Sequence, residues 1–183
     1  MASWYFEPGH TEDEFRARHM MVTWVRGLYK NVSGTMTFDP DDPGSMSFET
    51  SIDASSLWTG VQQRDDHLRS ADFLDVAHYP TITFKSTSVR QVGAQDFIVD
   101  GDLTLRGVTQ NVPLKVRYLG QWATPWWEDG IDKGPKMRAG FSARLQINRY
   151  DYGVSWNDKC GDDGVVVSPT LELRIDAEAI RKD

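Results

Sequence analysis

The 183-residue chain contains 39% hydrophobic and 26% charged residues, and its formal net charge is -7 at pH 7. This length and composition are typical of one soluble domain with its own core, and we expect residues 1–183 to form a single domain. The acidic balance excludes a basic surface that neutralises phosphates, so nucleic acid is not an expected partner. It also disfavours charge-driven docking on an anionic membrane.

Cysteine use and hydropathy indicate the compartment. Cys160 is the only cysteine, which excludes an intrachain disulfide and fits a reducing environment. Residues 1–15 lack the basic and apolar regions of a secretory signal, and no apolar run approaches the roughly 18 residues that a membrane span needs. We therefore expect a cytoplasmic protein without a membrane span.

The predicted elements are mostly strands, because apolar and polar residues alternate with a period of two. The first, at residues 14–20, places Phe15, Ala17 and His19 on one face. The later alternating segments are two hairpins, at 33–53 and 81–107 with the second turning near Gly93–Gln95, and three single strands, at 111–122, 137–153 and 164–180. About eight strands with short connections predict an antiparallel barrel or sandwich, which periodicity alone does not separate.

One crowded polar segment, near residues 60–75, interrupts the strands. Thr59 followed three residues later by Gln62 is a capping box, in which side chains satisfy the free amides of a helix start. Asp65 precedes Arg69 by four residues, the favourable order for a helical ion pair. We therefore predict a short amphipathic helix here, packed across one end of a barrel or against its outside.

Motifs for metal binding and catalysis are weak. The histidines form no H-x-H or H-x-x-x-H pair, and no cysteine or carboxylate cluster has ligand spacing, so we predict no metal site and no cofactor. Cys160 lies in the acidic stretch NDKCGDDG, where neighbouring carboxylates oppose thiolate formation. The sequence contains neither a nucleophile elbow nor a glycine-rich phosphate loop.

Asp13 is the most informative polar residue, because it shares strand parity with Phe15 and His19. The favoured interpretation is that the strand begins after Asp13 and the side chain is solvated, since an unpaired buried charge is costly. The alternative is that the strand includes Asp13. Its carboxyl then points inward and serves as a polar contact or an acid–base group for a ligand.

The tryptophans also allow two interpretations, a large aromatic core or the lining of a cavity. Trp126 and Trp127 lie in the turn-rich segment Pro125–Lys136. This segment is either a solvated connection or a cover over a cavity opening.

Four ordered blocks of the sequence carry a more specific signal. They are HTEDEFRARHMMVTWVRG (His10–Gly27), TGVQQRDDHLRSADFLDVAHYPTITFKST (Thr59–Thr87), GDLTLRGVTQNVPL (Gly101–Leu114) and RAGFSARLQINRYDYGVSWN (Arg138–Asn157). In order and spacing, these blocks resemble those of the YceI-like family, the lipocalin-like polyisoprenoid-binding proteins, over essentially the whole chain.

The resemblance implies an all-β fold, an eight-stranded antiparallel lipocalin-like barrel with a short helix between strands near residues 60–75. It implies a hydrophobic tunnel for an isoprenoid, quinone-like or fatty acid derivative, and no general catalytic apparatus. The motif residues would then be structural, with Arg64, Asp65 and His67 in a network that fixes the helix. Arg149 and Asp151 would form a pair at a strand end.

The chain departs from the family pattern near its first strand. The family usually has an aliphatic residue where this chain has Asp13, a valine in place of Ala17 and a serine in place of Thr11. The loop between Trp122 and Met137 also exceeds the common length. These differences predict a more polar opening and a wider tunnel near the first strand.

Our leading hypothesis is a non-enzymatic protein that carries or sequesters a hydrophobic small molecule. The ligand-binding residues expected from strand parity are Phe15, Ala17, His19, Phe84, Phe97, Val99, Leu103, Phe141, Leu145 and Tyr152, with Trp24 and Trp122 at the opening. One alternative is a barrel enzyme that performs cyclisation, isomerisation or addition on a polyketide or terpenoid, with Asp13 and His19 as catalytic groups. Another is an interaction protein with a solid core. The expected partner is the hydrophobic ligand, and a homodimer is left open.

Overall fold

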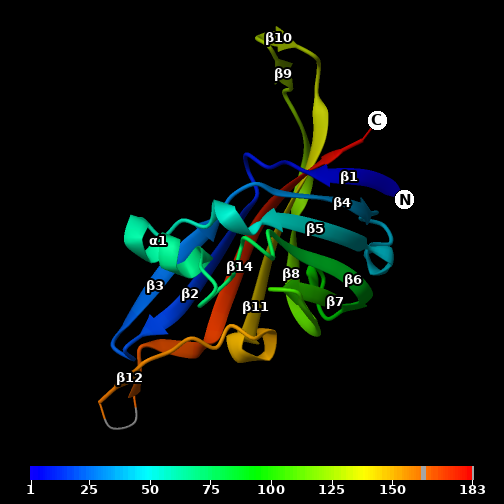
Figure 1. Ribbon diagram of the computed structural model, residues 1–183. Coiled ribbons are helices and arrows are strands. Elements are labelled where there is room, and N and C mark those ends of the chain that lie inside the picture. Colours follow the sequence, from blue (N-terminus) through cyan, green and yellow to red (C-terminus); the bar gives the residue numbers. More distant parts are fainter. Residues whose placement is uncertain (162–163, 183) are drawn as a thin grey trace.

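A closed antiparallel barrel dominates the computed structural model, which describes residues 1–161 and 164–182 (Figure 1). Eight strands form the ring in the order β1–β4–β5–β6–β7–β8–β11–β14, and β1 pairs with β14 to close it. Their bounds are β1 (Ala2–Phe6), β4 (Val32–Phe38), β5 (Ser47–Asp53), β6 (Thr81–Gln91), β7 (Asp96–Leu105), β8 (Val108–Thr124), β11 (Lys136–Asn148) and β14 (Val167–Arg181). The β1–β14 pairing excludes the sandwich, in which the ring of strands would stay open. The prediction of an eight-stranded barrel is confirmed.

A hairpin of β2 (Glu12–His19) and β3 (Thr23–Tyr29) lengthens the barrel wall beside β14. The long strand β14 pairs with β1 through residues 179–181 and with β2 through residues 167–176. Beyond β3, Leu28 and Trp58 exchange two backbone hydrogen bonds of 2.9 Å. One end of the barrel is therefore walled by β2, β3 and the segment around Trp58.

The remaining elements are short. They are the 3-10 helices η1 (Pro43–Ser45), η2 (Ala54–Ser56) and η3 (Arg149–Tyr152), the helix α1 (Gln62–Arg69), and the small strands β9 (Trp127–Glu128), β10 (Ile131–Asp132), β12 (Lys159–Cys160) and β13 (Gly164–Val165). Among the residues described, no helix is both long and apolar enough to cross a bilayer.

Sequence reasoning missed β1 and β3. In β1, only Trp4 and Phe6 are buried, which is too short a pattern to stand out. In β3, the inward position between Val25 and Tyr29 is Gly27, so the apolar alternation is broken. The glycine makes room for an aromatic ring, because a Cβ on Gly27 would lie 2.3 Å from Cζ of Phe15.

The helix forms where the sequence predicts it, but its start is built differently. The residue before α1 is Val61, whose side chain makes no capping bond, so the predicted capping box is wrong. Arg69 pairs with Asp66 at 3.4 Å and not with Asp65. The reason is that Asp65 points inward with 2% exposure and accepts its hydrogen bonds from Thr59.

An aromatic plug closes the barrel at the end distant from α1. It consists of Phe38, Tyr118 and Phe141, whose ring centroids lie 4.9 to 5.4 Å apart. Trp4 covers it and donates a hydrogen bond from Nε1 to the Phe38 carbonyl at 3.2 Å. Tilted and edge-to-face ring contacts of this kind add to the stabilisation from buried area, so this end of the core is firmly packed.

Candidate ligand-binding cavity

An apolar cavity of about 530 Å³ occupies the barrel between α1 and the aromatic plug. Side chains from all the strands of the ten-stranded sheet line it, from Phe6 of β1 to Ala177 of β14. Protein interiors are normally packed as densely as organic crystals, with few voids larger than a water molecule. Small-molecule sites commonly measure about 300–1,000 Å³. The alternative of a barrel packed solid by its own side chains is therefore wrong.

The cavity opens between α1 and the turn of the β2–β3 hairpin. Val61 and Gln63 are lining residues that are exposed, and Arg18, His19 and Val25 are half-buried. We refer to this side as the open end, and to the side of the aromatic plug as the closed end.

The segment Pro125–Lys136 does not cover this opening. Its two short strands, β9 and β10, form a hairpin that projects beyond the barrel, well away from α1 (Figure 1). No residue between Pro125 and Lys136 lines the cavity, and Trp127 is exposed. The interpretation of this segment as a cover is wrong, and the half-buried Trp126 instead packs under the cations of Lys136 and Arg138.

Most of the side chains that strand parity predicts to face inward do line the cavity. They are Phe15, Ala17, His19, Phe84, Leu103, Phe141 and Leu145. Phe97 and Val99 are buried but do not reach it, because parity gives the face of a strand and not the depth along the barrel. Tyr152 is buried in η3, where strand parity does not apply.

The two tryptophans predicted at the opening do not line the cavity. Trp122 is exposed on β8, and it does not line the cavity. Trp24, opposite Arg18 in the β2–β3 hairpin, lies beside the open end, and the guanidinium groups of Arg16 and Arg18 are 4.6 and 4.3 Å from its ring. The placement of Trp122 at the opening is therefore wrong, whereas Trp24 lies next to the opening without lining the cavity.

Asp13 points into the cavity. Strand β2 begins at Glu12, because Asp13 pairs with Ile175 of β14 and with Tyr29 of β3. The side chain is 7% exposed, and its buried Oδ1 has no hydrogen-bond partner in the part of the chain that the structure describes. Burial raises the pKa of Asp13 from 3.8 to about 7. The favoured interpretation of a solvated Asp13 is wrong, and the inward alternative holds.

Tyr29 is the titratable neighbour of Asp13 in the cavity wall. Burial, and secondarily the negative charge of Asp13, raise the pKa of the Tyr29 phenol, so it stays neutral. Its ring packs against Phe15 with centroids 5.3 Å apart. The Asp13 carboxyl thus faces hydrocarbon and one neutral phenol, and no described residue provides it with a cationic partner.

Asp13 and His19 do not form a catalytic pair. They lie six residues apart on one strand, so their Cα atoms are about 20 Å apart at roughly 3.3 Å per residue. His19 is opposite Val167 at the open end, whereas Asp13 is opposite Ile175 near the closed end. A shared proton needs hydrogen-bond contact or one bridging water, which this separation prevents.

A network centred on Thr59 holds α1 against the open end. The Thr59 hydroxyl donates to Oδ1 of Asp65 at 2.5 Å and accepts from Nε of Arg64 at 2.7 Å. The backbone N–H of Thr59 also donates to Asp65, at 2.9 Å. His67 pairs with Asp72 at 2.9 Å and packs edge-on against Trp156. The predicted network is confirmed for Arg64 and Asp65, although its centre is a threonine that sequence reasoning assigned to the helix cap. His67 lies outside this network and contacts Asp72 instead.

Arg149 has a different role from the predicted one. Its guanidinium is 1% exposed and donates to the carbonyl groups of Val154, Trp156, Val167 and Ser168 at 2.7 to 3.1 Å. Burial lowers the pKa of Arg149. Asp151 is exposed, so the predicted Arg149–Asp151 pair is wrong. The arginine instead ties the chain after β11 to the start of β14.

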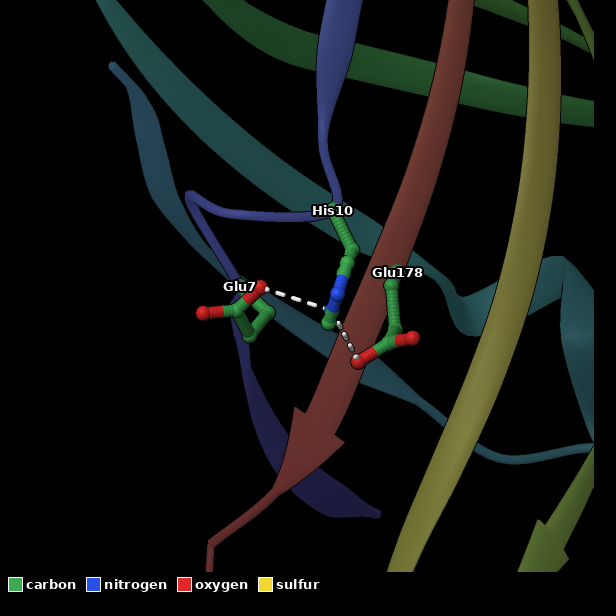
Figure 2. A group of neighbouring side chains, drawn as sticks. All are labelled: Glu7, His10 and Glu178. Carbon is green, nitrogen blue, oxygen red and sulfur yellow. Dashed lines mark ion pairs between the residues drawn. The ribbon is translucent and has the colours of Figure 1, made fainter.

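Glu7, His10 and Glu178 form a cluster on the outside of the barrel (Figure 2). Nδ1 of His10 lies 3.0 Å from Glu7 Oε2 and 3.5 Å from Glu178 Oε1. Arg138 also pairs with Glu178. The Arg138 guanidinium already supplies positive charge to Glu178, so we interpret the cluster as a structural network of polar contacts. Spacing in the sequence could not reveal it, because Glu178 comes from the far end of the chain.

Fold and cavity together define a class of protein, the antiparallel β-barrel with an internal apolar site and a helix at its opening. The model of the YceI-like domain matches residues 4–179. The chain therefore belongs to the YceI-like family, and the resemblance inferred from the sequence is confirmed.

Comparison with individual proteins agrees with this assignment. The chain is 41% identical over 148 residues to Protein YceI of Escherichia coli O17:K52:H18 (strain UMN026 / ExPEC), which covers 81% of this chain and 73% of that protein. The structure of BcnA from Burkholderia cenocepacia matches with a TM-score of 0.80 at 21% identity, over 94% of this chain and 98% of that one. A polyisoprenoid binding domain from Saccharophagus degradans, implicated in plant cell wall breakdown, matches with a TM-score of 0.69 at 15% identity over 100% of both chains. At these identities the two structures support the fold.

Proposed function

We propose that this protein binds a hydrophobic small molecule in the barrel and carries or sequesters it. The observation that carries the proposal is the cavity of about 530 Å³, walled by apolar side chains and open beside α1. The polyisoprenoid binding domain with the same fold supports a ligand of the isoprenoid, quinone-like or fatty acid class.

Hydrocarbon burial alone provides enough free energy for such binding. Each buried methylene contributes about 0.8 kcal/mol, so a chain of about 15 carbons gains about 12 kcal/mol before costs. Immobilising the ligand costs several kcal/mol, which leaves a dissociation constant of roughly micromolar or below. The cavity therefore needs no strong polar contact to retain an apolar guest.

The direct experiment has two parts. Organic extracts of the purified protein are analysed by mass spectrometry, and prenyl and fatty probes are titrated into delipidated protein. We expect a co-purifying lipid or saturable binding of at least one probe. A clean extract together with no probe binding would contradict the proposal.

A cavity-filling variant locates the binding site. Ala143 lines the cavity, and Ala143→Phe places a ring inside it, so we expect the probe affinity to fall about tenfold or more because the ring takes hydrocarbon space from the ligand. Arg144→Phe is the matched control, since Arg144 is the adjacent exposed residue on β11. Equal binding by both variants would place the ligand outside the barrel.

The barrel-enzyme alternative has less support, because Asp13 and His19 lie too far apart to act on one reacting group. A cytoplasmic location and a homodimer stay predictions, which cell fractionation and analytical ultracentrifugation would test.

A further inference from the structure

We infer that Asp13 is the binding site for a protonated amine, and that the ligand is an apolar molecule that enters with an ammonium group foremost. This inference rests on the proposed function and specifies the chemistry of the ligand. It follows from the depth of Asp13, from its lack of a partner, and from the charge that a partner must bring.

The register of β2 on β14 gives the depth of Asp13. Along β2 from the open end, His19 is opposite Val167 and Ala17 opposite Leu171, while Asp13 is opposite Ile175. The next inward residue of β14, Ala177, pairs with Phe141 of the aromatic plug. Asp13 thus lies one inward step from the closed end of the cavity. A group that contacts it must traverse the apolar bore first.

The ionisable groups of the cavity wall leave Asp13 without a counter-charge. Among residues 1–161 and 164–182, no ion-pair partner of the carboxyl is seen, and its buried Oδ1 accepts no hydrogen bond. Tyr29 of β3 is the titratable residue opposite it, and β14 presents Ile175. At the other end, Arg64 donates to Thr59 and Arg149 donates to backbone carbonyls. Arg18, over the Trp24 ring, His19, opposite Val167, and His67, paired with Asp72, also line the open end. The described cationic and histidine side chains of the wall therefore lie at a distance from Asp13.

A cation is a better partner for the Asp13 carboxylate than a neutral hydrogen-bond donor. A hydroxyl donates one hydrogen bond and leaves the charge of the carboxylate uncompensated in an apolar surrounding, which is costly. An ammonium group donates hydrogen bonds and cancels the charge, and such charge-assisted bonds are about twice as strong as neutral ones. Because the pair would form away from water, its attraction is screened less than at the surface. The apolar walls accommodate the hydrocarbon remainder of the ligand.

The experiment compares two twelve-carbon probes, dodecylamine and dodecanol, by isothermal titration calorimetry at pH 8. The wild type is expected to bind the amine about tenfold or more tightly than the alcohol, because the charge-assisted pair is the stronger contact. In Asp13→Asn the amine affinity should fall by about tenfold or more, while the alcohol affinity changes by less than about threefold. Asp13→Asn removes a buried unpaired charge, so the variant should fold at least as stably as the wild type.

Glu12→Gln is the matched control, because it removes one negative charge from the adjacent exposed residue of the same strand. It should leave both affinities unchanged. An amine preference that survives in Asp13→Asn, or that is lost equally in Glu12→Gln, overturns the inference. Equal binding of amine and alcohol by the wild type also overturns it but leaves the proposed function standing. Binding of neither probe contradicts the proposed function itself.

Discussion

Of the described residues, the buried polar side chains at the open end of the cavity are bonded within the chain, whereas Asp13 near the closed end is not. At the open end, Arg64, Asp65 and Arg149 are buried or half-buried, and each is bonded to the chain itself. Near the closed end, Asp13 is also buried, but its Oδ1 has no partner among the described residues. Buried polar groups are normally hydrogen-bonded, so the first set is explained by stability alone. The burial of the unpaired Asp13 carboxyl is explained instead by a ligand that supplies its partner.

The largest loss of stability is expected from substitution of Arg149, the most buried polar residue of the open end. Arg149→Ala leaves several buried carbonyl groups without a donor, so we expect the free energy of unfolding to fall by about 3–5 kcal/mol. Urea denaturation measures it. Arg149→Lys should restore only part of this free energy, because an ammonium group cannot reproduce the planar set of donors of a guanidinium. If Arg149→Ala cost no more than Arg144→Ala, an exposed change on the preceding strand, the structural role of Arg149 would be refuted.

Asp13 should make the protein less stable as the pH rises. In the unfolded chain its pKa is near 3.8, and in the folded protein it is about 7. Between pH 3.8 and about pH 7, Asp13 is ionised in the unfolded chain but still protonated in the folded protein, so raising the pH favours unfolding. The loss of stability ends above about pH 7. From pH 5 to pH 8 this amounts to roughly 3 kcal/mol for the unliganded protein.

Asp13→Asn removes this dependence and should exceed the wild type in stability at pH 8. Urea denaturation of both proteins at pH 5 and pH 8 measures the difference, with Glu12→Gln as the control for an exposed carboxylate. Parallel pH profiles for the wild type and Asp13→Asn would show that the carboxyl is solvated after all.

A smaller effect is expected from Thr59, which joins α1 to the wall. Thr59→Val removes the hydroxyl between Asp65 and Arg64, so we expect a loss of about 1–2 kcal/mol in unfolding free energy. Because α1 borders the opening, dissociation of a bound probe should also accelerate. Stopped-flow measurement of probe release tests this, and an unchanged release rate would show that α1 does not limit exit.

The smallest effect is expected from Trp127 in the projecting β9–β10 hairpin. The side chain is exposed and does not line the cavity. Trp127→Ala should therefore change stability by less than about 0.5 kcal/mol and leave probe affinity as it is. Substantially weaker probe binding by Trp127→Ala would show that the β9–β10 hairpin contributes to the ligand site.

Strand periodicity predicted the faces of residues such as Phe15, Phe84 and Phe141, because burial on one side of a strand repeats every two residues. The depth of Asp13 could not be predicted that way, since it depends on pairing with Ile175, far along the chain. The same limit applies to Arg149, whose partners are backbone carbonyls without a residue-type signal. The family blocks located α1 and its network, but they did not show which side chains contact one another.

A crystal structure of the protein saturated with a long-chain alcohol tests the central claim most directly. The account predicts the hydrocarbon chain inside the barrel, between α1 and the aromatic plug, in contact with Phe15 and Leu145. An interior collapsed onto its own side chains, with the alcohol outside the barrel or absent, would contradict it.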